Sequence, residues 1–318
     1  IILLNNILKT TNKYMKKLLK LDFLKAGDLI TIIFLNILSL IATYYYDTVS
    51  LWWLLVLINL VASFTIIIFI NFSENKQGLI KTIRDWYWYP IILVVFKEVY
   101  FIIQALELTD KDRVLIYIDR LIFGTDPTHW FMKFSHPVLT EYLQICYSTF
   151  YFIILAAPLY AYIKKNYDEY FYSFYIILLG FYISYIGYIL VPAIGPRFTL
   201  HDFYTLDTEL PGLFLYKPLR LLINLGESIP PNTSIAALVA QRDCFPSGHT
   251  EMTLLAIYLS FKYKQKIKWI LLIVGISLII ATVYLRYHYV IDVFAGAFAA
   301  LLVIVIAQPI SKLISRKP

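Results

Sequence analysis

The sequence predicts an all-α protein of the polytopic membrane class, with about eight transmembrane helices. Hydrophobic residues fill 60 % of its 318 positions and charged residues only 15 %, whereas soluble globular proteins carry about 25 % charged residues. Apolar segments of about 20 residues recur along the chain, and a helix needs this length to cross a hydrocarbon core of about 30 Å. Because that core offers backbone groups no water partner, helices with internal hydrogen bonds are the expected form.

The first segment, residues 1–28, is basic and amphipathic. Its lysines are Lys9, Lys13, Lys16, Lys17, Lys20 and Lys25. The pattern is typical of an interfacial helix that lies on the cytoplasmic surface and is attracted to anionic lipids. A basic tail that only marks the inner side of the membrane explains the same residues.

Apolar runs then predict the spans, the first two of which form an N-terminal helix pair within residues 29–87. The third span contains Lys97 and Glu98, and charges at this depth are costly and usually face a polar interior or a partner. Lys97 either lies near a functional site and supplies positive charge there, or belongs to a structural ion pair or snorkels to the interface. The predicted spans lie near 29–47, 51–71, 88–106, 139–162, 170–191, 249–263, 268–286 and 290–309.

Two outer segments separate these spans. Residues 107–138 are predicted to form a short helix that ends in a turn, as part of a re-entrant cap or a lid on the lipid side. Residues 192–247 hold seven of the thirteen prolines, and a loop of this length is normally functional or disordered. Its apolar stretches favour a packed cap that touches the bilayer.

Basic residues gather in alternate loops and in the tail, residues 310–318, which places both termini in the cytoplasm. This topology explains the net charge of +7 without nucleic acid as a partner. The expected location is a plasma or inner membrane. The two cysteines offer neither a disulfide framework nor a zinc spacing.

The most informative stretch begins with Cys-Phe-Pro-Ser-Gly-His-Thr, residues 244–250. Ser247 can cap the apolar helix that follows. The free N–H groups at that helix start favour an anion, and Gly248 lets a ligand approach the backbone. His249 is placed there to give or take a proton.

A second run, residues 284–292, places His288 and Asp292 on one face of a helix. A carboxylate at this spacing can fix the histidine tautomer and leave the other ring nitrogen free as a nucleophile. Between the two runs the chain crosses the bilayer twice, so His249 and His288 are expected on the same, extracytoplasmic face.

These residues resemble the type 2 phosphatidic acid phosphatase (PAP2) superfamily. Pro-Ser-Gly-His, residues 246–249, and His288-x3-Asp292 look like its second and third motifs, and Gly-Pro-Arg-Phe, residues 195–198, resembles its first. The resemblance covers residues 88–309 and implies a six-helix catalytic core.

The motifs also depart from the usual pattern. Leu190 stands where the family's lysine is usual, Ala281 and Thr282 replace a Ser-Arg pair, and Arg286 appears near the second histidine. The form of the motifs is similar to the branch that contains inositol phosphorylceramide synthases.

The resemblance implies phosphoryl transfer through a phosphohistidine on His288, oriented by Asp292, with His249 as acid and base. Arg197 and Arg286 would hold phosphate oxygens together with Ser247 and Gly248. No cofactor and no metal are expected, because cationic side chains and a helix N-terminus supply the charge.

Three functions stay open. A phosphotransferase moves a phosphate or phospho-head group from a lipid phosphate ester to a lipid or sugar alcohol. A lipid phosphatase passes the phosphate of phosphatidate or an isoprenyl diphosphate to water. A lipid or ion transporter with vestigial motifs would instead use the charges at Lys97 and Glu98.

Overall fold

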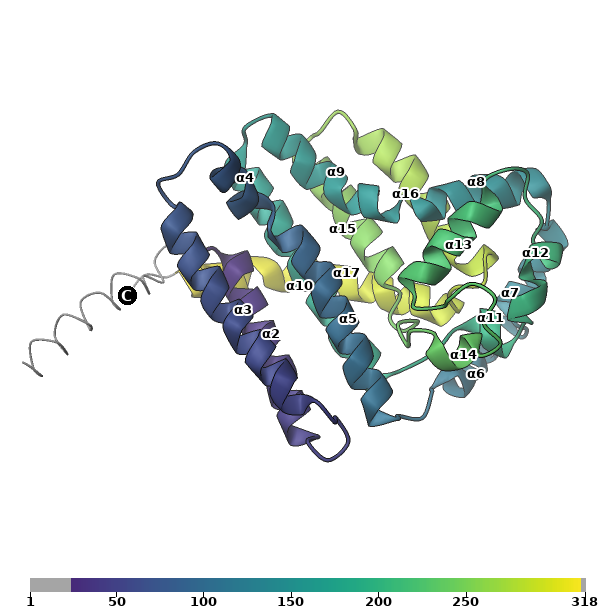
Figure 1. The fold of residues 1–318 in the computed structure, drawn as a ribbon. Coiled ribbons are helices and arrows are strands. Elements are labelled where there is room, and N and C mark those ends of the chain that lie inside the picture. Colours follow the sequence, from purple (N-terminus) through teal and green to yellow (C-terminus); the bar gives the residue numbers. More distant parts are fainter. Residues whose placement is uncertain (1–23, 316–318) are drawn as a thin grey trace, which may run out of the picture. The chain divides into compact units, whose positions relative to one another are not determined.

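The computed structural model describes residues 24–315, with side chains up to residue 312 (Figure 1). The predicted interfacial segment 1–28 therefore lies almost wholly outside the described residues. The chain divides into two compact units, residues 1–106 with 309–318 and residues 107–308. Each unit is considered by itself.

The described part of the first unit is a set of apolar helices with a few internal polar contacts. Asp28 accepts hydrogen bonds from Arg84 Nη2 at 2.8 Å and from the Tyr87 hydroxyl at 2.5 Å. Asn59 Nδ2 donates to Glu98 Oε1 at 2.6 Å. Its helices are α2 (Ala26–Tyr44), α3 (Trp52–Ser73), α4 (Leu79–Trp86) and α5 (Trp88–Leu106).

Lys97 lies on α5, in this first unit. Its ammonium is 5.7 Å from the centroid of the Phe96 ring and 5.9 Å from that of Tyr100. The motif residues belong to the other unit, so a contribution of Lys97 to the site stays a prediction.

The second unit is a helical bundle with a cap of short helices, and its described residues contain no β-strand. Helix α15 is central, since it packs against α9, α10 and α16 (Figure 1). The bundle helices are α8 (Pro137–Ser148), α9 (Phe150–Ile163), α10 (Tyr167–Leu190), α15 (Gly248–Lys262), α16 (Lys268–Tyr284) and α17 (Val290–Ser315), the last of which continues past this unit. The outer helices are α6 (Asp112–Phe123), α7 (Pro127–Phe131), η2 (Met132–Phe134), α11 (Pro196–Thr199), η3 (Phe203–Thr205), α12 (Leu206–Glu209), α13 (Tyr216–Gly226) and α14 (Ala236–Val239).

The predicted count of eight spans is not confirmed. Five helical segments in the described part of the chain are long and apolar enough to cross a membrane, and a sixth counts if the pair α8 and α9, bent by 48°, is one span. Helix α16 is apolar but shorter, and α15 has only 15 residues. At about 1.5 Å per residue, 15 residues give about 22 Å, which is less than a full hydrocarbon core.

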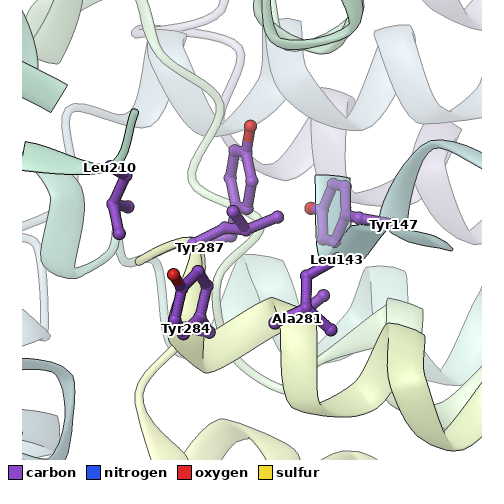
Figure 2. Packing of buried hydrophobic residues seen from close by; sticks show 7 residues of the cluster. Leu143, Tyr147, Leu210, Ala281, Tyr284 and Tyr287 are labelled. Atoms are coloured by element: carbon purple, nitrogen blue, oxygen red, sulfur yellow. The ribbon is translucent and has the colours of Figure 1, made fainter. Parts of the chain in front are cut away.

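The long loop 192–247 is a folded cap. Glu141 on α8 anchors it, since its carboxylate accepts backbone N–H groups from residues 213–216 at 2.5–3.2 Å. Leu210 of the cap joins a buried cluster with α8, α16 and the loop after α16 (Figure 2). The members of this cluster are Leu143, Tyr147, Leu210, Ala281, Tyr284, Leu285 and Tyr287.

Candidate active site

The three motifs meet where helices of the second unit begin and end, and main-chain hydrogen bonds join them. Ser247 N donates to the Asp292 carbonyl at 3.0 Å, which ties the start of α15 to the start of α17. Arg197 N donates to the Arg286 carbonyl at 3.0 Å, which ties the first motif to the third. The site therefore has a backbone frame that does not depend on its catalytic side chains.

Ser247 caps α15, as its place in the sequence predicts. Its side chain accepts a hydrogen bond from Thr250 N at 3.3 Å. Gly248 is needed for packing, because a Cβ there would collide with the Tyr188 hydroxyl of α10. The side-chain face of Gly248 is thus covered by α10, and only its backbone N–H remains for an anion.

His249 lies in an aromatic stack. Its ring is 4.5 Å from that of Tyr147 at an interplanar angle of 22°, and 4.2 Å from that of Phe150. The His288 ring is 5.7 Å away, centroid to centroid. The structure therefore brings the two histidines together, and stacking fixes the plane of His249.

The tautomer of His288 follows from its partners. Nδ1 is 2.9 Å from the Cys244 carbonyl oxygen and 3.5 Å from Asp292 Oδ2. Both atoms can only accept, so Nδ1 carries the proton and Nε2 carries the lone pair. Within residues 24–312, Nε2 has no hydrogen-bond partner.

Asp292 shares the orienting role that the sequence assigns to it. Its Oδ2 accepts from Tyr289 N at 2.8 Å and from the Cys244 thiol at 2.9 Å, closer than His288 Nδ1. Burial, and next the Asp292 charge, raise the pKa of the Cys244 thiol well above its ordinary value, so the thiol stays protonated and donates. Cys244 is a site residue that sequence reasoning missed. It contacts His288 through its main-chain carbonyl, which every residue type has, so the sequence gives no signal for it.

Arg197 reaches the site through the same stack. Its guanidinium carbon lies 4.7 Å from the centroid of the Tyr287 ring, and that ring is stacked on Tyr147 at 4.3 Å. Nη1 donates to Asn224 Oδ1 at 3.1 Å and Nη2 pairs with Glu227, both from the cap. Nε is buried and has no partner among the described residues.

Arg286 is fully buried at the cap side of the third motif. Its Nη1 pairs with Glu209 of α12, and its Nε and Nη2 have no partner in the described part of the chain. Glu209 also receives a hydrogen bond from Thr205 at 2.7 Å. The structure thus brings Arg286 to a cap carboxylate and not into contact with either histidine.

Two aspartates of α6 brace the motif loops. Asp112 accepts from Gly195 N and from the Tyr289 hydroxyl, each at 2.8 Å. Asp119 accepts from Val290 N at 2.9 Å and from the next backbone N–H at 2.8 Å, which caps the start of α17. Sequence reasoning missed both, since acids in an outer segment carry no motif.

One group of side chains could hold a metal ion. Cys244 Sγ, His288 Nδ1 and Asp292 Oδ2 lie within 4.8 Å of one another and are buried. The same atoms are already engaged in the hydrogen bonds described above, with thiol to carboxylate at 2.9 Å. These hydrogen bonds give each of the three residues a role without a metal ion. The expectation that no metal is needed stays a prediction.

Comparison with known families gives one match. The sequence model of the PAP2 superfamily matches residues 113–306, which include all three motifs. No curated protein matches the chain, and no solved structure matches it.

Proposed function

Since the chain belongs to the PAP2 superfamily, we propose that it is a membrane phosphotransferase that works through a phosphohistidine intermediate. Membership indicates a lipid phosphatase or phosphotransferase type of activity on lipid phosphate substrates. The observation that carries the proposal is the state of His288, whose Nδ1 is held by the Cys244 carbonyl while Nε2 is left unpaired beside His249.

In the first step, the lone pair of His288 Nε2 attacks phosphorus, and the bond from phosphorus to the leaving oxygen breaks. His249 gives that oxygen a proton, so the leaving group departs as a neutral alcohol. The positive charge that develops on the His288 ring is shared with Asp292 through Nδ1–H.

Non-bridging oxygens of the phosphoryl group need donors during this step. The Gly248 backbone N–H at the start of α15 and the Ser247 hydroxyl are one source, since the Ser247 N–H is already bonded to the Asp292 carbonyl. Arg197 is another, and its Nε–H is unpaired among the described residues. Arg286 is a third source, since its Nε and Nη2 have no partner among the described residues while its Nη1 stays paired with Glu209.

In the second step, His249 removes the proton of an acceptor hydroxyl, and that oxygen attacks the phosphohistidine. The bond between Nε2 and phosphorus breaks and returns the lone pair to the ring. A lipid or sugar alcohol as acceptor gives a new phosphoester. Water gives free phosphate when the donor is a phosphomonoester, and the phosphorylated head group when the donor is a phosphodiester. Transfer is favoured by the folded, partly apolar cap 192–247, which could shield the intermediate from water, and by motifs similar to the inositol phosphorylceramide synthase branch.

The test uses purified full-length protein in vesicles with a phosphatidylinositol labelled in its phosphate and a mixed pool of lipid alcohols. A new labelled lipid that disappears in His288→Ala, but not in the matched variant His136→Ala, supports transfer. His136 is an exposed histidine that caps α8 and lies outside the motifs.

Two other results would change the assignment. Free phosphate from phosphatidate or an isoprenyl diphosphate, without any new lipid, makes the protein a phosphatase. If no substrate is turned over and His288→Ala is indistinguishable from the wild type, the assignment as an enzyme is overturned and a transporter is favoured.

A further inference from the structure

Tyr147 occupies the middle of the aromatic stack at the site. Its ring lies between that of His249, at 4.5 Å and 22°, and that of Tyr287, at 4.3 Å and 12°. Arg197 covers Tyr287. Two near-parallel neighbours hold the Tyr147 ring in one plane, so its hydroxyl has a defined position beside His249.

The Tyr147 hydroxyl is buried and unpaired. The residue is 2 % exposed, and the hydroxyl has no hydrogen-bond partner within residues 24–312. Buried hydroxyls nearly always have a partner, because leaving one unpaired costs free energy. A polar ligand is therefore the expected partner.

The nearby Arg197 narrows the chemistry of that ligand. Its Nε is also buried and unpaired among the described residues, and its guanidinium covers the same Tyr287 ring that stacks on Tyr147. An arginine N–H can only donate, and a tyrosine hydroxyl donates as well. A group that satisfies both is an acceptor with several oxygens, which describes a phosphoryl group.

From this juxtaposition we infer that Tyr147 contacts the substrate, donating its hydroxyl hydrogen to a non-bridging phosphoryl oxygen next to the one bound by Arg197 Nε–H. The inference rests on the proposed function and adds a donor from α8 to the motif residues. It assigns a role to a residue outside all three motifs.

The test compares Tyr147→Phe with Tyr175→Phe in the purified full-length protein, with orthovanadate as the phosphoryl mimic. Tyr175 is a matched control, since it is also a buried tyrosine of the second unit, but its hydroxyl donates to the Ala307 carbonyl at 3.0 Å. Isothermal titration calorimetry gives the vanadate Kd, and thermal unfolding without ligand gives the Tm.

Tyr147→Phe is expected to weaken vanadate binding about tenfold and to leave the ligand-free Tm unchanged or higher, because the lost hydroxyl has no protein partner. Tyr175→Phe is expected to lower the Tm and leave the Kd unchanged. Equal Kd values for the wild type and Tyr147→Phe would overturn the inference while the proposed function stands. Absence of vanadate binding to the wild type would overturn both.

Discussion

At the scale of single residues, a main-chain carbonyl, that of Cys244, is the nearest partner of His288 Nδ1. The Asp292 carboxylate is 0.6 Å farther from the same nitrogen, at 3.5 Å against 2.9 Å. Two acceptors thus fix the tautomer of His288, and one of them is a main-chain carbonyl, which no side-chain substitution removes. Because of this redundancy, loss of the His288 nucleophile and loss of the Asp292 carboxylate are expected to lower the turnover by different amounts.

We expect His288→Ala to lower turnover by on the order of 10²–10⁴-fold, because it removes the atom that attacks phosphorus. Asp292→Asn should cost far less, about tenfold, since the Cys244 carbonyl still orients the ring. Steady-state kinetics on one labelled lipid compares the two. Equal losses would mean that the negative charge of Asp292, which shares the positive charge on the His288 ring, is as necessary as the nucleophile.

The cap carboxylate of Glu227 should weaken anion binding, because it occupies Arg197 Nη2 and repels a phosphoryl group. Glu227→Gln is therefore expected to tighten orthovanadate binding by about three- to tenfold. Asp207→Asn is the matched control, since Asp207 is also a cap acid but pairs with Arg220, outside the stack. Calorimetric Kd values decide, and a weaker affinity in Glu227→Gln would show that the pair positions Arg197 for binding.

At the scale of elements, α6 braces the site. Asp112 and Asp119 lie two turns apart on α6 and hold the first motif and the start of α17. Two acids of the segment 107–138, Asp112 and Asp119, thus bind backbone groups of the motif loops, and a cap or lid on the lipid side stays a prediction for this segment. A carboxylate at the N-terminus of α17 also complements the helix dipole.

Asp119→Ala is expected to destabilise the protein by about 1–2 kcal/mol, the cost of a lost helix cap. Activity should fall as well, because α17 begins next to His288 and carries Asp292. Thermal unfolding in detergent measures the first effect. Arg120→Ala is the neighbouring control, and it should lower the stability much less, since its pair with Asp126 is solvent-exposed on the arginine side. Equal effects of the two changes would contradict the bracing role.

The close approach of α17 to the start of α15 depends on Gly296. A Cβ at this position would collide with the Ser247 carbonyl, a main-chain atom that cannot rotate away. Gly296→Ala should therefore cost about 1–3 kcal/mol and lower activity through the displaced cap of α15. Gly226→Ala, where a Cβ meets nothing within 4 Å, should leave the Tm nearly unchanged. A Tm loss in Gly226→Ala as large as in Gly296→Ala would argue against specific packing.

At the scale of the whole molecule, the sequence predicted the helices better than their surroundings. Apolar runs mark the bundle helices, although the single run 139–162 divides into α8 and α9, and the cap residue Ser247 marks the start of α15, because these signals are local. The cap helices have as few as three residues, too few for any periodicity to indicate them. The partners of Arg197 and Arg286 could not be predicted, since these partners come from the folded cap. The stacking of His249 on Tyr147 could not be predicted either, because Tyr147 lies about a hundred positions before His249 in the sequence.

The predicted topology has a direct test, because both native cysteines are buried and give little background labelling. With motif loops outside and both termini in the cytoplasm, Lys217→Cys on the cap should react with a membrane-impermeant maleimide on intact cells. Lys266→Cys, in the loop between α15 and α16, should react only after permeabilisation. Both positions are exposed, so accessibility of the side chain does not differ. The reverse labelling pattern would mean that the chain has the opposite orientation in the membrane.

The backbone bonds between motifs have a practical consequence. The bonds from Ser247 N to the Asp292 carbonyl and from Arg197 N to the Arg286 carbonyl involve no catalytic side chain. A chain that lacks the His288 imidazole should therefore keep the arrangement of its motif loops and still bind its donor lipid, without the means to consume it. This inactive variant should bind the natural substrate from a crude lipid extract without turning it over, so that mass spectrometry can identify the bound lipid.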